Sequence, residues 1–524
     1  MPQIDDLLLS FGISPEENGQ STPPPPQETP TATVQAEVKT VEEKSEPQAS
    51  PSLREKVDIV QEEQLKPAAK EPLSHAEKIE AARTNSRINP DLIGTATSNS
   101  TASKRNTKDG VFFPSSPNTL EEAGASLSEV SNLILKFLYS SGVETGYRVS
   151  IQLGLKFPLI EAILRQLKLE RLVGYKNSIA GGDYLYELTD LGRERSRTLT
   201  QQSTYFGTAP VPLKMYIESV HQQSIADRKP PLESIRRAFA DLDINDRMIS
   251  NIGQAIHSGR GMFLYGPAGN GKTSMAERVT KSFGDTIWIP KAIIASGEVL
   301  RMYDPNRHRI VPITEQEEQE VDGRWVKIER PTIIAGGELT MENLEITYIR
   351  KTGIGEAPLQ MKSNCGTLLI DDFGRQRMST DELLNRWIVP LEQRIDFLHM
   401  ESGRTIQVPF DQLIIFSSNL EPRDLVDDAF LRRIPYKIHV LDAEENDFRN
   451  LFIKLARKDK FSCSPEAVDY LIQEHYVAAQ RPFRYCHPRD LMRQIENRST
   501  LHNLPKEITK DAIDQAVENY FSIM

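Results

Sequence analysis

Nine residues set the fold of this chain: Gly266-Pro267-Ala268-Gly269-Asn270-Gly271-Lys272-Thr273-Ser274. They follow the apolar run 261–265, a predicted buried strand, and lead into a predicted helix that begins near Lys272. This is the P-loop pattern G-x-x-x-x-G-K-S/T between a strand and a helix, as the motif requires. Its glycines let backbone N–H groups turn toward phosphate oxygens, and the helix adds the positive end of its dipole.

The side chains of the P-loop point to ATP and Mg²⁺ as ligands. Lys272 supplies a positive charge for the β- and γ-phosphates, and the hydroxyl of Thr273 is a ligand for Mg²⁺. Further along, the apolar run 367–370 ends in Asp371 and Asp372. Asp371 is predicted to hold Mg²⁺ through water, and Asp372 to act as the base that orients the attacking water. The sequence therefore predicts an α/β domain that binds and hydrolyses ATP.

From about residue 236 to 524 the chain resembles the AAA+ ATPases, on these two motifs and on three weaker ones in the family's order. The run 413–418 ends in Asn419 and resembles sensor 1, which implies that Asn419 holds the attacking water and the γ-phosphate. Most AAA+ proteins carry Glu where this chain has Asp372, and the shorter Asp occurs in helicase-loader and initiator branches. The resemblance implies self-association into a homo-oligomeric ring, expected to be a hexamer.

The same resemblance assigns roles to three arginines. Segment 427–433 resembles the region that presents an arginine finger to a neighbouring subunit, with Arg433 preferred and Arg432 in reserve. Arg489 follows His487 and Pro488 at the start of a predicted helix, which resembles sensor 2 and implies that Arg489 reaches back to the phosphates. The alternative for all three is a local ion pair, with partners among Asp427, Asp428, Asp490 and Glu496.

Two stretches depart from a minimal AAA+ core. More than sixty residues separate the predicted second strand, 286–290, from the strand 367–370, and they include a further predicted strand at 323–328. A predicted hairpin at 397–408 precedes sensor 1 and resembles that of the branch holding MoxR-like, NtrC-like and Clp/Lon-type ATPases. Both stretches face the central pore in AAA+ rings, or they are neutral surface insertions.

Two regions precede the AAA+-like part. Residues 1–120 are rich in Pro, Glu, Gln, Ser and Thr and are predicted to be a disordered tether, with an apolar head at 4–13 that is a docking peptide or a frayed end. Residues 121–202 resemble a winged helix-turn-helix domain: helices, a hairpin after 172, and a helix after Thr189. Basic and acidic residues are nearly balanced there, so binding to DNA and binding to protein both stay open.

Composition narrows the function classes. The 524 residues carry a net charge of −11, which argues against non-specific coating of nucleic acid. The three cysteines form no disulfide framework, and no metal site beyond Mg²⁺ is predicted. No apolar run is long enough to span a membrane, so a cytoplasmic protein without membrane insertion is expected.

The chain is thus expected to contain a linker at 203–235, an AAA+ nucleotide-binding domain at 236–440 and a helical lid at 441–524. The first hypothesis is a ring-forming ATPase that remodels an unknown protein client. The second is a DNA-associated ATPase of helicase-loader or transposition-helper type. The third is an ATP-gated scaffold that barely hydrolyses.

Overall fold

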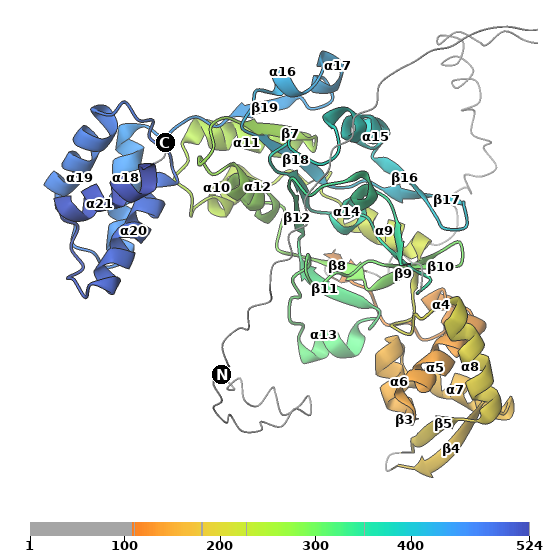
Figure 1. The fold of residues 1–524 in the computed structure, drawn as a ribbon. Helices are drawn as coiled ribbons and strands as arrows, with labels where there is room; N and C mark the ends of the chain where they lie inside the picture. The colour runs from red at the N-terminus through yellow and green to blue at the C-terminus, as the bar shows by residue number, and fades with distance from the viewer. Residues whose placement is uncertain (1–106, 109–110, 180–181, 227, 350–351, 523–524) are drawn as a thin grey trace, which may run out of the picture. The chain divides into compact units, whose positions relative to one another are not determined.

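The computed structural model describes residues 107–108, 111–179, 182–226, 228–349 and 352–522 (Figure 1). All of them belong to the second of two compact units, 95–524. The predicted apolar head at 4–13 and most of the predicted tether lie outside the described residues.

A five-stranded parallel sheet forms the centre of the α/β fold. Its order is β12-β15-β18-β7-β19, with β12 and β19 at the edges. The strands span Thr332–Ala335, Thr367–Ile370, Leu413–Ser418, Met262–Tyr265 and Tyr436–His439, respectively. The P-loop, the pair Asp371 and Asp372, and Asn419 each follow a strand, as the sequence predicts, and these three strands are adjacent in the sheet.

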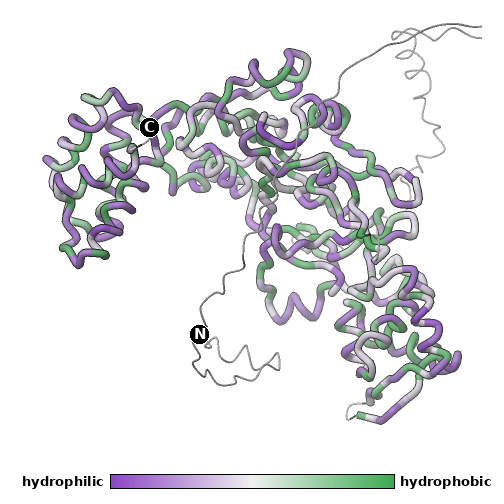
Figure 2. Tube along the Cα trace, viewed as in Figure 1, coloured by the Kyte–Doolittle hydropathy of each residue, from purple (hydrophilic) through white to green (hydrophobic). Residues whose placement is uncertain are grey.

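Helices cover both faces of this sheet because its strands carry apolar side chains on both sides. One face packs against α15 (Thr380–Gln393) through Leu383 and Trp387. The other face packs against α11 (Asp246–Ser258) and α12 (Lys272–Lys281). Figure 2 shows hydrophobic and hydrophilic residues alternating along the chain in the same view. Short helices α16 (Pro422–Leu425) and α17 (Asp428–Leu431) precede the edge strand β19.

The second strand of the central sheet is not the one that the sequence analysis assigned. Residues 286–290 form β8, which pairs antiparallel with β11 (Trp325–Glu329) in a separate two-stranded sheet. The strand beside β15 is instead β12. Both runs are short and rich in β-branched residues, so local pattern does not distinguish them. The inserted residues therefore lie on both sides of β12: one part precedes β12, and the other lies between β12 and β15.

A second sheet combines four strands of the inserted segments with β6, which lies in the segment 203–235. Its order is β13-β14-β10-β9-β6. The strands are Thr347–Ile349, Ile354–Glu356, Glu298–Arg301, Ala292–Ala295 and Val211–Pro212. Helices α13 (Glu315–Glu320) and α14 (Leu359–Lys362) and the 3₁₀ turn Met341–Leu344 lie in the same insertions.

The predicted hairpin before sensor 1 is present as β16 (Ile395–His399) and β17 (Thr405–Pro409). Its tip is held by the carboxylate of Glu298, which accepts from the backbone N–H of Glu401 at 3.2 Å and of Ser402 at 3.0 Å. The hydroxyl of Tyr348 donates to the same carboxylate at 2.6 Å. The hairpin tip is thus tied to the second sheet.

Residues 111–202 form helices and a hairpin in the predicted order. The helices are α4 (Leu120–Ala123), α5 (Leu127–Ser141), α6 (Gly146–Leu153), α7 (Phe157–Leu169) and α8 (Asp190–Gln202). The strands β3 (Glu144–Thr145), β4 (Val173–Ser178) and β5 (Tyr184–Leu188) form a sheet of order β3-β5-β4. A short pair, β1 (Thr107–Lys108) and β2 (Val111–Phe112), precedes them.

The segment 203–235, expected to be a linker, contains helix α9 (Leu213–Gln223) and the start of α10 (Leu232–Ala238). Tyr216 and Val220 of α9 are buried in a core shared with the second sheet. Two of the four prolines on which the linker prediction rests, Pro212 and Pro231, are the N-cap residues of these two helices. Proline is compatible with a helix start, and its local signal there is the same as in a loop.

The C-terminal region contains helices, and the assignment of 441–524 as a lid stays a prediction. The elements are α18 (Glu445–Lys458), α19 (Pro465–Ile472), a π-helical turn (Gln473–Val477), α20 (His487–Leu501) and α21 (Lys510–Phe521). Their apolar faces form a separate core around Phe448, Phe452 and Tyr476. No helix in the described part of the chain has the length and apolar character needed to cross a membrane.

Candidate active site

The P-loop makes a tight turn at the carboxyl end of β7. Gly266, Gly269 and Gly271 have φ angles of 137°, 87° and 78°, which disfavour any residue with a Cβ. A Cβ on Gly266 would lie 2.3 Å from the carbonyl oxygen of Val440. Helix α12 begins at Lys272, and no side chain caps its first N–H groups. Those N–H groups are therefore free of a capping partner and can donate to an anion.

Lys272 is buried at the base of the loop with 8% of its surface exposed. Its Nζ donates to the carbonyl oxygens of Gly266 at 2.8 Å and Pro267 at 3.0 Å, and to Oδ1 of Asn419 at 2.8 Å. Burial lowers the pKa of Lys272, while the nearby carboxylates Asp371 and Asp372 oppose that shift. Its direct hydrogen-bond acceptors are uncharged, so a bound phosphate would give the ammonium an anionic acceptor in direct contact.

Thr273 and the two predicted carboxylates meet beside Lys272. The Thr273 hydroxyl donates to Oδ2 of Asp371 at 2.8 Å. The backbone N–H of Asp372 donates to Oδ1 of Asp371 at 3.1 Å, and Nδ2 of Asn419 donates to Oδ1 of Asp372 at 3.3 Å. Asp372 is exposed and has a φ of 49°. A hydroxyl and a carboxylate at hydrogen-bond distance are oxygen ligands that Mg²⁺ accepts together with phosphate oxygens and water.

The remaining P-loop residues connect the loop to the C-terminal helices. Asn270 is 1% exposed, and its Nδ2 donates to Asp442 at 2.7 Å. Its Oδ1 accepts from the backbone N–H of Tyr485 at 3.3 Å. The backbone N–H of Cys486 donates to the carbonyl of Gly269 at 2.9 Å. Pro267, Ala268 and Ser274 are partly or fully exposed along the same loop.

The two arginines named as finger candidates lie at the end of α17. Nε of Arg433 donates to Glu392 of the same chain at 2.7 Å. Arg432 is exposed and, within the described residues, has no carboxylate within ion-pair distance. It lines an open cleft of about 870 Å³ together with Tyr265, Arg423 and Lys437. Neither arginine pairs with Asp427 or Asp428 among the described contacts, and Asp427 instead caps α17.

The predicted sensor 2 residue is turned to solvent in this chain. The Arg489 side chain is 69% exposed, and its Nε donates to Asp490 at 3.1 Å. Arg484, which the sequence analysis did not select, lies closer to the P-loop. A Cβ on Gly269 would be 3.6 Å from Cδ of Arg484. Nε of Arg484 is buried and has no hydrogen-bond partner among the described residues.

Arg484 carries no signal in the sequence that could have identified it. It stands in the segment Arg481-Pro482-Phe483-Arg484, which matches no nucleotide-binding motif. Tertiary contacts of the two residues that follow it, Tyr485 with Asn270 and Cys486 with Gly269, bring it to the loop. Among the described residues, no group of three or more His, Cys, Asp or Glu side chains forms a further metal site.

Comparisons with known proteins give distant likenesses. A family model described as a domain of unknown function (DUF8689) matches residues 444–519. No curated protein matches the chain. Among solved structures, NtrX from Brucella abortus in complex with ATP is 13% identical over 55% of this chain and 61% of that chain, with a TM-score of 0.35. The RuvB Holliday junction branch migration motor of Thermotoga maritima is 12% identical over 55% of this chain and 73% of that chain, with a TM-score of 0.31. The matched region thus spans about three fifths of NtrX.

Proposed function

We propose that this chain binds ATP with Mg²⁺ at the P-loop and hydrolyses it, as a ring-forming AAA+ ATPase that remodels a protein partner. One observation carries the proposal. Lys272, Thr273, Asp371, Asp372 and Asn419 come from three separate strand ends and form one hydrogen-bonded cluster. Such a cluster provides a cation for phosphate, oxygen ligands for Mg²⁺, and a base for water in one place.

The proposed mechanism assigns each polar group one task. The N–H groups at the start of α12 and the ammonium of Lys272 hold the phosphates. Thr273 and Asp371 would hold Mg²⁺, which when bound neutralises charge on the β- and γ-phosphates. Asp372 accepts a proton from water while the water oxygen bonds to the γ-phosphorus and the bond to the bridging oxygen of ADP breaks. Asn419 orients that water and donates to Asp372.

The ring is tested by the arginines acting between chains. Hydrolysis by the Arg433→Ala chain and by the Lys272→Ala chain should each be weak. A mixture of the two chains should recover part of the activity, because each interface needs one intact P-loop and one intact finger. The ion pair between Arg433 and Glu392 is partly exposed, and such a pair contributes only about 0–1 kcal/mol.

Phosphate release by the mixture at several protein concentrations is the measurement, with Arg432→Ala as the parallel variant. If activity recovers when the Lys272→Ala chain is mixed with the Arg432→Ala chain but not with the Arg433→Ala chain, Arg432 is the arginine finger. Activity that is independent of protein concentration in a monomer would contradict the ring.

The two candidate phosphate sensors, Arg484 before α20 and Arg489 within it, differ in their surroundings, and this allows a direct comparison. We expect Arg484→Ala to weaken ATP binding by about tenfold, because a charge-assisted hydrogen bond contributes about 1.5–3 kcal/mol. We expect Arg489→Ala to change it less than about threefold, because that side chain is largely in solvent. Nucleotide titration of both variants is the test. A larger loss of ATP affinity in Arg489→Ala than in Arg484→Ala would favour Arg489 as sensor 2.

A protein partner is favoured over DNA by the surface of residues 121–202, which we propose to be a winged-helix docking module. Arg165 on α7 pairs with Glu161 at 2.6 Å. The Nζ of Lys168 lies 3.4 Å from the ring centroid of Tyr175. Arg165 and Lys168 are the two cations that α7, the candidate recognition helix, carries, on a chain whose net charge is −11. Two cations can contact few phosphates.

DNA binding by the full chain is accordingly expected to be weak. We expect mixed-sequence duplex DNA to bind no more tightly than about 10⁻⁶ M at physiological salt, which is the non-specific range. Fluorescence anisotropy at two salt concentrations measures this. Sub-micromolar, sequence-selective binding would instead favour the DNA-associated ATPase.

A further inference from the structure

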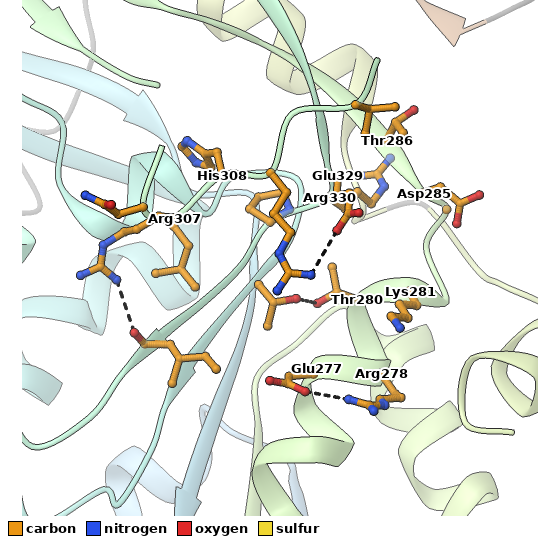
Figure 3. Close-up of a pocket in the computed structure, with 18 of the residues that line it drawn as sticks. Glu277, Arg278, Thr280, Lys281, Asp285, Thr286, Arg307, His308, Glu329 and Arg330 are labelled. Carbon is orange, nitrogen blue, oxygen red and sulfur yellow. Dashed lines mark hydrogen bonds and ion pairs between the residues drawn. The ribbon is translucent and has the colours of Figure 1, made fainter. Parts of the chain in front are cut away.

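A polar cleft of about 1000 Å³ opens beside β12, the edge strand of the central sheet (Figure 3). Its walls come from the last turn of α12, from residues 305–311 and from the ends of β8 and β11. The P-loop lies at the opposite end of α12, where Lys272 begins the helix. The cleft is therefore separate from the nucleotide site.

The floor of the cleft includes unpaired backbone of β12. The carbonyl oxygens of Pro331 and Ala335 accept from the N–H groups of Thr367, the first residue of β15, and Asp371, which follows β15, both at 2.9 Å. Because backbone groups alternate along a strand, those of Thr332 and Ile334 face the other edge. No strand in the described ranges pairs with that edge. The described contact there is a long one, from Nη1 of Arg307 to the carbonyl of Ile334 at 3.4 Å.

The lining is basic, although the chain is acidic overall. Five arginine and lysine side chains line the cleft against three carboxylates. Figure 3 shows Arg307 on one side and Lys281 on the opposite side. Within the described residues neither has a carboxylate at ion-pair distance, since the ion pairs of this region involve Arg278 and Arg309. Nε of Arg330, a residue only 7% exposed, also has no hydrogen-bond partner there.

We propose that this cleft binds an acidic, extended peptide segment of a partner protein, which adds as a strand to the free edge of β12. Backbone pairing with Thr332 and Ile334 would supply affinity, and carboxylates beside Lys281 and Arg307 would supply selectivity. The four residues of β12 span about 13 Å at roughly 3.3 Å per residue, so four to six peptide residues fill the edge. A small anion or a nucleic-acid strand has no row of backbone amides that could hydrogen-bond to the free edge of β12.

The test uses the full chain and a fluorescein-labelled peptide of alternating glutamate and valine. A second peptide has lysine in place of glutamate, and a third keeps the glutamates but has N-methyl groups on alternate amides. We expect saturable binding of the first peptide only. N-methylation should weaken it by tenfold or more, because it removes the strand's hydrogen-bond donors without changing its charge.

Charge reversal in the chain provides the matched comparison. The double variant Lys281→Glu/Arg307→Glu should weaken binding by about tenfold or more. Lys458→Glu is the control, because Lys458 is likewise an exposed lysine in the last turn of a helix, α18. Lys272→Ala should bind the peptide normally, so failure at the nucleotide site and failure at the cleft are distinguishable.

Three results would overturn the proposal. One is equal binding of the N-methylated peptide, which would leave only a general anion site. Another is unchanged affinity in the Lys281→Glu/Arg307→Glu variant, which would place the peptide elsewhere. The third is tighter binding of a single-stranded oligonucleotide that competes with the peptide and is lost in the same variant.

Discussion

Replacing Lys272 with alanine should weaken ATP binding about 100-fold or more. The side chain is buried at the base of the P-loop, and among the described residues its Nζ has only neutral acceptors. Removing the ammonium leaves the phosphates without their nearest cation, and hydrogen bonds to charged groups each contribute about 1.5–3 kcal/mol. Because burial already lowers the pKa of Lys272, a bound phosphate would also stabilise its charged form.

Titration with a fluorescent ATP analogue measures this effect. Lys281→Ala is the matched control, because it removes a lysine from the far end of the same helix. Both variants should unfold thermally near the wild-type temperature, since the three bonds of Lys272 are made within one loop and to one side chain. Unchanged nucleotide affinity in a folded Lys272→Ala chain would mean that ATP does not bind at the P-loop.

Replacing Asp372 with asparagine should preserve ATP binding and lower turnover about 100-fold or more, the scale of losing a positioned base. Asparagine keeps the side-chain oxygen that accepts from Asn419, but it cannot take a proton from water. It also tolerates the left-handed conformation of this position, where φ is 49°. The variant should therefore fold and bind ATP, but it should not hydrolyse the bound ATP at the normal rate.

Phosphate release and nucleotide titration on the same Asp372→Asn preparation separate these effects. Asp381→Asn, at an exposed carboxylate in the first turn of α15, is the matched control. Near-normal turnover in Asp372→Asn would mean that another group orients the water. A parallel loss of binding would mean that Asp372 acts in holding the nucleotide.

The parts of the site that the sequence predicted are those in which chemistry depends on adjacent residues. The P-loop and the pair Asp371 and Asp372 each follow a strand directly, so their placement follows from parallel pairing of those strands. Asn419 was found for the same reason, one residue after β18. Strand ends of a parallel sheet lie at one edge, and this brings residues far apart in the sequence together.

The parts that were missed depend on long-range packing. The runs 286–290 and 332–335 have similar strand-forming sequences. Pairing with β15 is what places 332–335, and not 286–290, in the central sheet. Arg484 reaches the P-loop because Cys486 hydrogen-bonds to Gly269, a contact between residues more than two hundred positions apart. Helix α9 was interpreted as linker because of its flanking prolines, yet Tyr216 is buried beneath the second sheet. None of these contacts has a local signature.

Steady-state phosphate release by the purified chain, titrated with ATP and with Mg²⁺, tests whether the P-loop cluster hydrolyses ATP. We expect saturable release that requires Mg²⁺, with release by Lys272→Ala and Asp372→Asn near the background. Release by the wild-type chain that does not exceed that of Lys272→Ala would show that this cluster does not hydrolyse ATP.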